Sequence, residues 1–357
     1  MNFTKSILIT GDNYGSKVND PFSYGRVLAQ ELSKNLKVYL SGSFLKMLKI
    51  AADVDAVFAL SPLGSGYSGY ISAGFRKKKF FIKIDDDYAW RAAIESGKTY
   101  FLASDFQKSK KTSRIAALHK RQIRLCHKAE LVIVPSKFMS DVVHSWGIEQ
   151  EKIKTISDPV NFSAVPISKE EARKKVAIPG NLLVSVGSLV PWNGFRMLIK
   201  LMPQISTINQ FFRLIIIGDG PEYKTLKTMI KNMGLDKKVS LVGHKNQEEL
   251  DLFLAASDMF VLNSGHEPFP NNVIKAMACG TPVITTAVGA NTEIIKQGEN
   301  GFMVRYNDEF NLIEAIKTVW QMPELRERFT EEGKKTAESF SLDKTIKETA
   351  KVINSKL

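Results

Sequence analysis

The sequence lacks the marks of several protein classes. It has two cysteines in 357 residues, Cys126 and Cys279, each within an apolar stretch. We therefore expect two free core thiols in a reducing cytoplasm rather than a disulfide framework. No apolar run approaches the ~20 residues that span a bilayer, and the apolar part of residues 1–10 is too short for a signal peptide. These absences predict a cytoplasmic globular protein whose chain opens with a β-strand.

Three kinds of active site are also missing from the sequence. None of the five histidines stands at a metal-ligand spacing, and no Ser/His/Asp grouping can be recognised. The G-x-G-x-x-G spacing of a dinucleotide-binding turn is absent as well. The motifs therefore give no support to a zinc enzyme, a triad hydrolase or a dinucleotide-dependent enzyme.

The net charge of +13 is concentrated in the first half of the chain. Residues 1–165 carry 25 Lys/Arg against 15 Asp/Glu, a net of +10, and the remainder carries 25 against 22, a net of +3. The clusters Arg76–Lys79 and Lys108–Lys111 are the local sources. Such a bias indicates an anionic partner, either a membrane face, a lipid phosphate or nucleic acid. Nucleic acid is disfavoured because no basic motif with interleaved aromatics is present, and a solvated surface that keeps the protein soluble is the alternative.

Short apolar runs alternate with longer helical patterns along the whole chain, which predicts parallel sheets with crossover helices. A chain of this length favours two domains. The region 158–180 has a proline at its start, a charged middle and a Pro-Gly end, so we place the linker there. Two doubly wound halves would face a cleft at the carboxyl ends of their strands, where such folds bind ligands. The strand candidates are SILIT, KVYL, AVFAL, KFFIKI and LVIVP in the first half, and NLLVSVG, FRLIIIG, KVSLVG, MFVL and TPVITT in the second.

The most specific string is GHEPFPNNVIKAMACGTPVITT, residues 265–286. It contains an acidic residue, a loop restricted by proline, a helical pattern and a buried strand. Pro270 precedes the helical pattern, and Asn271 is the expected N-cap. Backbone N–H groups at such a helix N-terminus can cradle a phosphate.

This string resembles the donor site of glycosyltransferase family 4, a family of retaining enzymes of the GT-B fold, with two Rossmann-like domains. The resemblance implies that Glu267 contacts the hydroxyls of the transferred sugar. It also implies that the loop of Phe269, Pro270, Asn271 and Asn272 holds the sugar and the distal phosphate. A structural turn of an unrelated α/β protein is the alternative, which the length of the string disfavours.

Other segments resemble the same family in order and spacing. VSVGSLVPWNGF resembles the strand and loop that open the donor domain, and LIIIGDGPEY resembles the next strand and turn. Each segment is weak alone, since a lone Gly-Asp-Gly after a strand would equally suit a dinucleotide binder. The resemblance assigns donor-binding positions to Gly218 and Asp219 in this turn, and to Gly243 and His244 at the nucleobase.

The resemblance also implies a division of the chain. An acceptor-side domain would cover residues 1–160, a linker 161–180 and the donor domain 181–335. Residues 336–357 have the pattern of an amphipathic helix, which would pack back on the N-terminal domain and couple the two domains mechanically.

Three donor-site positions depart from the family pattern. Ser188 and Asn193 stand where the family has an arginine and a lysine that bind the diphosphate, and Lys275 replaces a glutamate that grips the donor ribose. Family members generally work without a metal, so cations and helix dipoles stabilise the departing diphosphate. Two lost charge-assisted hydrogen bonds are worth ~3–6 kcal/mol, a rate loss of roughly 10² to 10⁴. Lys275 could return part of this loss by swinging to the diphosphate, but it cannot replace a ribose acceptor.

Three carboxylates, Asp85, Asp86 and Asp87, end an apolar run on the acceptor side. The resemblance implies that Asp86 or Asp87 orients an acceptor hydroxyl, at a point where family members often carry histidine. An N-cap for the following helix is an equal alternative, and a metal site is disfavoured because the metal-dependent fold has another architecture. In the first loop, Gly11 and Gly15 would let the backbone approach donor phosphate or acceptor, although the family's usual glycine pair is altered.

These features predict a retaining glycosyltransferase that moves a sugar from a nucleotide-sugar donor to a glycan or lipid-linked acceptor, with no metal or other cofactor. We expect it in the cytoplasm, at the inner membrane face if the basic domain binds anionic lipid. The alternative is a weakened or inactive homologue that binds a glycan or a partner protein, which Ser188, Asn193 and Lys275 motivate. A nucleotide-sugar epimerase or phosphorylase of similar fold lacks a supporting motif.

Overall fold

The computed structural model describes residues 5–11, 21–160 and 167–357 and divides the chain into two compact units. The first unit contains residues 1–159 and 342–357, and the second contains residues 160–341. The chain therefore passes from one unit to the other twice. Helix α8 (Lys169–Val176) packs against α11 (Gln247–Ala255) within the second unit.

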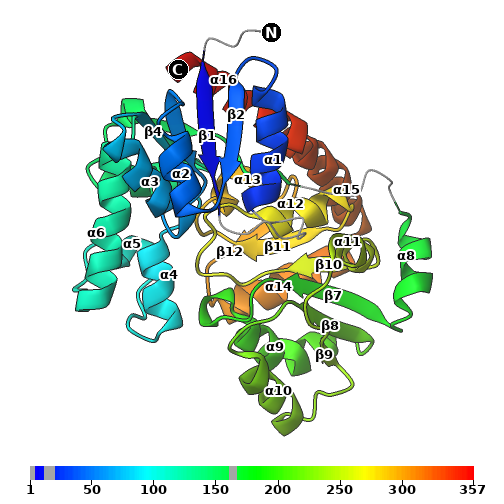
Figure 1. Ribbon diagram of the computed structural model, residues 1–357. Helices are drawn as coiled ribbons and strands as arrows, with labels where there is room; N and C mark the ends of the chain where they lie inside the picture. The colour runs from blue at the N-terminus through cyan, green and yellow to red at the C-terminus, as the bar shows by residue number, and fades with distance from the viewer. Residues whose placement is uncertain (1–4, 12–20, 161–166) are drawn as a thin grey trace. The chain divides into compact units, whose positions relative to one another are not determined.

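The first unit is built on a parallel sheet. Its described residues form six strands in the order β2-β1-β3-β4-β5-β6. Both faces of the central strands are buried, as in a sheet covered by helices on each side (Figure 1). The strands are β1 (Ser6–Thr10), β2 (Lys37–Ser41), β3 (Ala56–Ala59), β4 (Lys79–Lys83), β5 (Leu131–Val134) and β6 (Ile153–Thr155).

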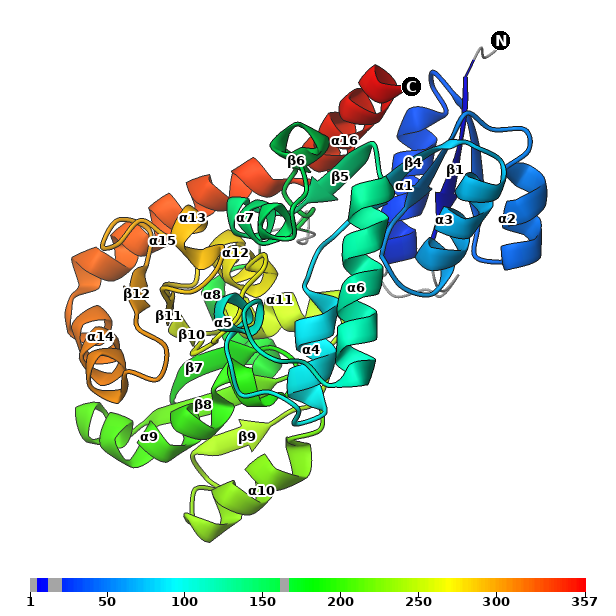
Figure 2. The same ribbon diagram turned by 90° about the vertical axis from the view of Figure 1, so that its left-hand side faces the viewer.

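The helices of the first unit lie on both faces of this sheet (Figures 1 and 2). One apolar cluster joins the sheet to α1 and α16, and another joins it to α2, α3, α6 and α7. The helices are α1 (Pro21–Leu32), α2 (Phe44–Ile50), α3 (Ser65–Phe75), α4 (Tyr88–Glu95), α5 (Ala103–Phe106), α6 (Ser113–Lys128), α7 (Lys137–Ser145) and α16 (Leu342–Lys356), with a 3-10 turn η1 (Gln150–Lys152).

The second unit repeats the parallel arrangement. Its described residues form six strands in the order β12-β11-β10-β7-β8-β9. The strands are β7 (Asn181–Val186), β8 (Phe212–Ile217), β9 (Val239–Leu241), β10 (Met259–Val261), β11 (Val283–Thr286) and β12 (Phe302–Val304). The remaining helices are α9 (Phe195–Ile208), α10 (Tyr223–Asn232), α12 (Asn271–Ala278), α13 (Asn291–Ile294), α14 (Glu309–Gln321) and α15 (Pro323–Ala337), with 3-10 turns η2 (Pro191–Asn193) and η3 (Glu338–Phe340).

Ten of these strands coincide with the apolar runs that the sequence indicates, and the two that it misses are β6 and β12. Each of these has three residues and lies at the edge of its sheet. β6 buries only Ile153, and β12 buries only Val304 fully. β6 carries no apolar run, and the three apolar residues of β12 are too short a run to indicate a strand, so tertiary pairing rather than local pattern selects both.

Helix α16 completes the first unit from the far end of the chain. It packs against α1, and the Tyr24 and Thr349 hydroxyls are 2.9 Å apart (Figure 1). Burial raises the pKa of Tyr24 to about 12. Thr345 Oγ1 donates to Ser157 O (3.1 Å), so α16 also holds the segment that leaves the unit. On the other side of this crossing, Val160 N–H donates to Phe340 O (3.1 Å) within the second unit.

Lys83 and Asp158 form a buried ion pair in the first unit. Lys83 ends β4 and is 8% exposed, and its ammonium meets the Asp158 carboxylate. Burial alone would lower the pKa of Lys83, but the charges of Asp158 and Asp85 outweigh it and hold the pKa above its ordinary value. The pair thus fixes the last residues before the chain passes to the second unit.

Neither cysteine is paired, since Cys126 is a buried free thiol and Cys279 a half-buried one. Burial raises the pKa of both, to about 12 for Cys279. No helix in the described part of the chain is both long enough and apolar enough to cross a membrane.

Three glycines join the carboxyl ends of β7, β8 and β9. Gly187 N–H donates to Ile217 O (3.0 Å), and Gly218 N–H donates to Gly243 O (2.9 Å). Gly218 has φ +145°, and a Cβ there would lie 1.9 Å from Gly187 O. Only glycine allows the loops after β7 and β8 to approach this closely.

We predict that Gly218→Ala lowers the free energy of unfolding of the second unit by about 3 kcal/mol or more, because it adds a steric clash to backbone strain. Gly234→Ala is the matched control. Gly234 also has positive φ, but a methyl group added there would meet no atom within 4 Å, so its cost should be about 1–2 kcal/mol. Urea denaturation measures both, and equal losses would contradict the steric argument.

Candidate functional site

The loop that follows β10 is held by the loop that follows β7. Gly265 N–H donates to Trp192 O (2.7 Å), and Ser264 Oγ donates to Asn193 Oδ1 (3.2 Å). Thr286 Oγ1, at the end of β11, donates to Ser264 O (2.5 Å). The carboxyl ends of β7, β10 and β11 therefore form one hydrogen-bonded edge. The loop of residues 264–270, here called the acidic loop, starts from this edge.

Glu267 lies on this loop and is half-buried. Its carbonyl oxygen accepts from Ala290 N–H (2.8 Å). Gly289 has φ +57°, and a Cβ there would lie 2.2 Å from Glu267 O. A glycine is thus required at 289 for the two loops to touch, and this contact fixes the backbone from which the Glu267 carboxylate projects.

The next residues turn the chain into α12. Phe269 is buried and packs edge-on against Phe340, with ring centroids 5.8 Å apart, so its side chain anchors the loop. Pro270 occupies the N-cap position and Asn271 is the first helical residue, which corrects the expectation that Asn271 is the cap. Pro270, the N-cap residue, makes no capping hydrogen bond with its side chain. The Asn271 N–H donates back to Phe269 O (3.0 Å), and the next N–H groups of the first turn face out of the helix end with its positive dipole.

Asn272 connects this helix end to the central strand. Its Nδ2 donates to Val186 O (3.2 Å), the last residue of β7. The N-terminus of α12 therefore lies beside the carboxyl end of β7. A helix N-terminus at such an edge is suited to an anionic group.

Ser188 and Asn193 lie on the loop between β7 and α9, where the family pattern has two cations. Ser188 is exposed, and its carbonyl oxygen accepts from Asn193 Nδ2 (2.8 Å). Asn193 is 9% exposed, and its Oδ1 accepts from Ser264. The asparagine amide thus closes the loop on itself and binds it to the acidic loop, a role that a lysine side chain could not fill on both sides.

Lys275 is buried in α12, with 3% of its surface exposed. Its Nζ donates to Gln247 Oε1 (2.8 Å), and Gln247 Nε2 donates to Asp251 Oδ1 (2.6 Å) on α11. Burial lowers the pKa of Lys275, and the charge of Asp251 acts in the opposite direction. The Lys275 ammonium is therefore held by α11. A movement of this side chain toward a diphosphate, which the sequence alone allows, would break its hydrogen bond to Gln247.

The remaining predicted donor residues lie along the ends of β8 and β9. Asp219 is exposed, and its Oδ1 accepts from Gly220 N–H (2.7 Å). Its carbonyl oxygen accepts from Leu189 N–H (2.9 Å), so the turn is bound to the Ser188 loop. Gly243 has φ +73°, and His244 after it is exposed.

In the first unit, Gly11 is buried directly after β1, and Gly15 lies outside the described residues. Asp86 is 8% exposed, and its Oδ1 accepts from Asp87 N–H (2.8 Å). Arg91 Nη1 lies 3.6 Å from Asp86 Oδ2. Asp86 and Asp87 follow β4, so they lie at the same carboxyl edge as Gly11.

Asp87 is fully buried and caps α4. Its Oδ1 accepts from Ala89 N–H and Trp90 N–H (3.1 Å each). The two glutamine amides of Gln122 and Gln107 also donate to the carboxylate, at 2.7 Å each. The N-cap alternative for Asp87 is therefore confirmed.

The described residues contain no group of three or more His, Cys, Asp or Glu side chains arranged to hold a metal ion. Asp85 in particular accepts from the Tyr88 hydroxyl (2.6 Å), and burial raises its pKa. The Asp85–Asp87 triplet thus has separate partners rather than one shared centre.

A known protein family matches most of the second unit. Residues 168–336 match the family model of glycosyl transferases group 1. The match covers the edge built from the Ser188, Gly218 and Glu267 loops and helix α12.

Among curated glycosyltransferases, the chain is 28% identical over 207 residues to the lipopolysaccharide core biosynthesis glycosyltransferase LpsE of Rhizobium meliloti. The aligned part covers 58% of this chain and 58% of LpsE. A Campylobacter jejuni enzyme named N-acetylgalactosamine-N,N'-diacetylbacillosaminyl-diphospho-undecaprenol 4-alpha-N-acetylgalactosaminyltransferase is 25% identical over 229 residues, 63% of this chain and 60% of that enzyme. The chain thus matches less than two thirds of the length of either relative.

Among solved structures, Anabaena HepE in complex with UDP-glucose aligns with a TM-score of 0.79 at 18% identity, covering 99% of this chain and 100% of HepE. WaaG, described as a glycosyltransferase involved in lipopolysaccharide biosynthesis, aligns with a TM-score of 0.70 at 15% identity, covering 97% of this chain and 99% of that chain. These likenesses show the fold. The chain has GT-B architecture, with two parallel-sheet α/β units, as the sequence predicts.

Several residues that organise this edge were missed by sequence reasoning. Thr286 ends β11 and Ser264 comes shortly after β10, and a small polar residue at the end of a buried strand is the signal that could have found them. Gln247 and Asp251, which hold Lys275, lie on another helix, and Gln107 and Gln122 reach Asp87 from α5's end and α6. Helical contacts of this kind have no local signature.

We predict that Asp87→Ala lowers the free energy of unfolding by about 3 kcal/mol, because it removes a helix cap and the acceptor of the buried Gln122 amide. The half-buried Gln107 amide keeps Ala103 O as an acceptor (3.0 Å). Asp308→Ala removes the N-cap of α14, whose Oδ1 accepts from Asn311 N–H (3.0 Å). This control should cost only about 1 kcal/mol. Urea denaturation provides the comparison, and a stable Asp87→Ala protein that loses activity would instead support a catalytic role.

Proposed function

We propose that this protein transfers a sugar from a nucleotide-activated donor to a glycan or lipid-linked acceptor, with retention of anomeric configuration and without a metal. The observation that carries the proposal is the loop from Glu267 to Asn272. It projects a half-buried carboxylate and ends at an uncapped helix N-terminus beside β7. The family match over residues 168–336 supports it, as do the relatives named for transfer to lipopolysaccharide core and to a diphospho-undecaprenol acceptor.

In this proposal the α12 N-terminus holds the distal phosphate of the donor. First-turn N–H groups and the helix dipole stabilise the negative charge as the diphosphate leaves. Glu267 binds the hydroxyls of the sugar, positioned by the contact of its carbonyl oxygen with the Ala290 N–H. The nucleobase lies near Gly243 and His244. The HepE structures with UDP and UDP-glucose support a uridine nucleotide as the first donor to test.

The departing diphosphate would meet neutral groups at two positions where the family has cations. The hydroxyl of exposed Ser188 can donate one hydrogen bond, and the Asn193 amide is already bonded to Ser188 O. Replacing two charge-assisted hydrogen bonds by neutral ones costs ~1–2 kcal/mol each. We therefore propose a slow enzyme, with a rate about 30- to 1,000-fold below that of a fully charged site.

The alternative function is a glycan-binding or partner-binding protein that keeps the fold without catalysis. The observation that favours it is that Asn193 and Lys275 are both held by protein contacts. Asn193 closes its own loop, and Lys275 is held on α11 by Gln247. In the first unit, Asp86 is the residue we propose to orient an acceptor hydroxyl if transfer occurs.

The two functions are separated by a thermal-shift panel of nucleotides and nucleotide sugars, followed by a transfer or hydrolysis assay. We predict that a nucleotide diphosphate stabilises the protein and that Glu267→Gln lowers transfer roughly 100-fold. The nucleotide shift should persist in this variant, because the carboxylate binds the sugar. Glu248→Gln, at an exposed position of α11, serves as control. A protein that binds no nucleotide and turns over no donor would contradict transfer.

Restoring the family residues tests the alternative. We predict that Ser188→Arg, Asn193→Lys and Lys275→Glu together increase nucleotide-sugar affinity at least tenfold, provided that Asp251→Asn accompanies them. Without this fourth change, a new carboxylate at position 275 would face the 5% exposed Asp251, and like charges at a buried site destabilise the fold. If the unaltered protein already binds as tightly as the restored one, the non-catalytic alternative fails.

A further inference from the structure

Three helices of the first unit contain no acidic residue. They are α2, α3 and α6, whose sequences are FLKMLKI, SGYSGYISAGF and SRIAALHKRQIRLCHK. The segment Arg76–Lys79 that directly follows α3 adds four more cations. Asp53 and Asp55 follow the C-terminal end of α2, and Asp55 accepts from Ser6 N–H (2.7 Å).

The cations of α6 form a stripe. Arg114, Arg121, Arg124 and Lys128 are all exposed. At 100° per residue they fall within about 80° of arc on the helix surface. The buried residues Ile115, Gln122, Leu125 and Cys126 occupy another side, which packs on the unit. The stripe is therefore directed outward along most of the helix.

Apolar side chains are exposed on the two neighbouring helices. Leu45 of α2 is 71% exposed, and Phe75 at the end of α3 is 78% exposed. Phe44 and Ile71 are 41% and 37% exposed. Lys46 and Lys49 are exposed on the same short helix α2. Large apolar residues in water are unfavourable unless a partner covers them.

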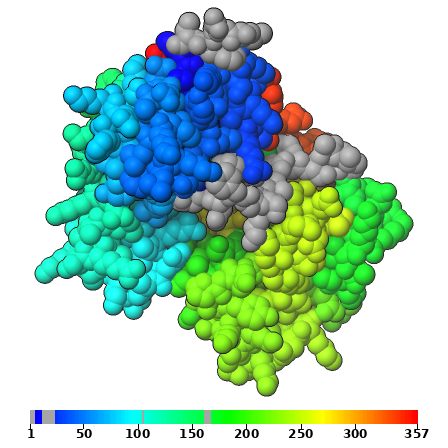
Figure 3. Space-filling model, viewed as in Figure 1, coloured from blue at the N-terminus to red at the C-terminus, as the bar shows by residue number. Residues whose placement is uncertain are grey.

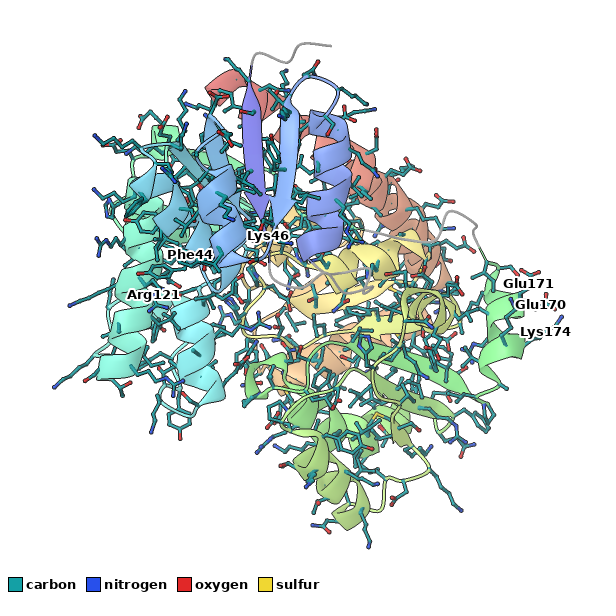
Figure 4. All side chains as sticks on the ribbon, in the orientation of Figure 1. Phe44, Lys46, Arg121, Glu170, Glu171 and Lys174 are labelled. Atoms are coloured by element: carbon teal, nitrogen blue, oxygen red, sulfur yellow. The ribbon has the colours of Figure 1, made fainter. Side chains whose placement is uncertain are left out.

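Contacts join these helices into one surface. α2 packs against α3, and the Arg121 guanidinium of α6 lies 4.6 Å from the ring centroid of Tyr67 on α3. Figure 4 labels Phe44, Lys46 and Arg121 on this surface, and Figure 3 shows the exterior of the first unit in blue and teal. We call the surface of α2, α3 and α6 the cationic face.

We propose that the cationic face docks on an anionic lipid bilayer. Exposed Lys and Arg are attracted to anionic headgroups, at about 1 kcal/mol for each cation near the surface. Leu45 and Phe75 supply apolar groups that can enter the boundary between headgroups and acyl chains. The cations steer and the apolar residues insert, and neither set is buried in the protein itself.

Nucleic acid would satisfy the cations but not the aliphatic residues. A phosphate backbone binds Lys and Arg, and nucleic-acid binders add aromatics that stack on bases, a role open to Phe44 and Phe75. The exposed Leu45 and Ile71 have no such role, and aliphatic side chains gain more from an acyl boundary than from a phosphate backbone. The bilayer is therefore the partner that fits the whole surface.

Helix α8 of the second unit shows what a solvated surface in this chain looks like. Glu170, Glu171 and Lys174 are labelled there in Figure 4. Lys174 pairs with Glu170 at 2.9 Å, and Glu171 forms a capping box with Ser168. Alternating charges that neutralise one another need no partner, whereas the cationic face carries one sign of charge.

The test is co-sedimentation of the full chain with vesicles of phosphatidylcholine alone or with 30% phosphatidylglycerol, at about 50 and 300 mM salt, where screening differs. We expect binding to the anionic vesicles only, weaker at the higher salt. Arg121→Glu with Arg124→Glu should lower the partition coefficient at least 30-fold, as loss of two cations near the surface requires. The matched control is Lys224→Glu with Lys227→Glu, the same charge change at exposed positions of α10, which should bind like the unaltered protein.

A second variant pair separates insertion from charge alone. Leu45→Ser with Phe75→Ser keeps every charge and should lower binding at least tenfold at 300 mM salt, whereas Phe211→Ser, at another exposed phenylalanine, should leave it unchanged. Circular dichroism and the nucleotide thermal shift verify that each variant is folded, and they report on the proposed enzyme separately. The proposal is overturned if no vesicle is bound, if the α10 control loses as much, if the apolar pair has no effect, or if duplex DNA binds more tightly than the vesicles.

Discussion

The second unit depends on close backbone approach along the carboxyl edge of its sheet. The loop after β8 lies against Gly187 O, and the loop after β11 lies against Glu267 O, at positions where a Cβ would clash. Asn193 and Ser264 then join the loops after β7 and β10 by side-chain hydrogen bonds. Asn272 bonds the α12 N-terminus to Val186 O, so hydrogen bonds connect the whole edge. A site built in this way is preorganised, because its groups lose little freedom when a ligand binds.

Lys275, Gln247 and Asp251 form a cluster that joins α12 to α11. Lys275 thus has a structural role at a position where the family pattern has a ribose-binding glutamate. A glutamate at 275 would share a buried site with Asp251, and two carboxylates there would repel one another. A lysine at this position donates to the Gln247 amide oxygen and is attracted by the Asp251 carboxylate, so it avoids this repulsion. The lysine on α12 and the acid on α11 are therefore coupled by their charges, although they lie 24 residues apart.

The sequence predicted the strands of the fold better than the side-chain contacts of the candidate site. Ten strands were predicted because buried parallel strands are continuous apolar runs, whereas β6 and β12 exist only through edge pairing. The order of glycines and of the Glu267 loop indicated the edge where the loops of the second unit approach closely, because such an approach requires glycine at particular positions. Side-chain partners have no such signature in the sequence. Pro270 rather than the expected Asn271 is the N-cap of α12, and no local pattern predicts that Gln107 and Gln122 both donate to Asp87.

The distribution of charge sharpens what kind of enzyme this would be. The three altered positions of the second unit offer no free cation at its edge, since Ser188 and Asn193 are uncharged and Lys275 is held by Gln247 and opposed by Asp251. The excess of cations belongs instead to the first unit, on helices that carry no acid. Cations used for phosphate stabilisation must lie within a few ångströms of the leaving group, whereas cations used for surface attraction act over a Debye length of about 8–10 Å. In the proposed enzyme, the donor edge would rely on dipoles and neutral donors, and the cations of the first unit would serve long-range attraction to an anionic surface.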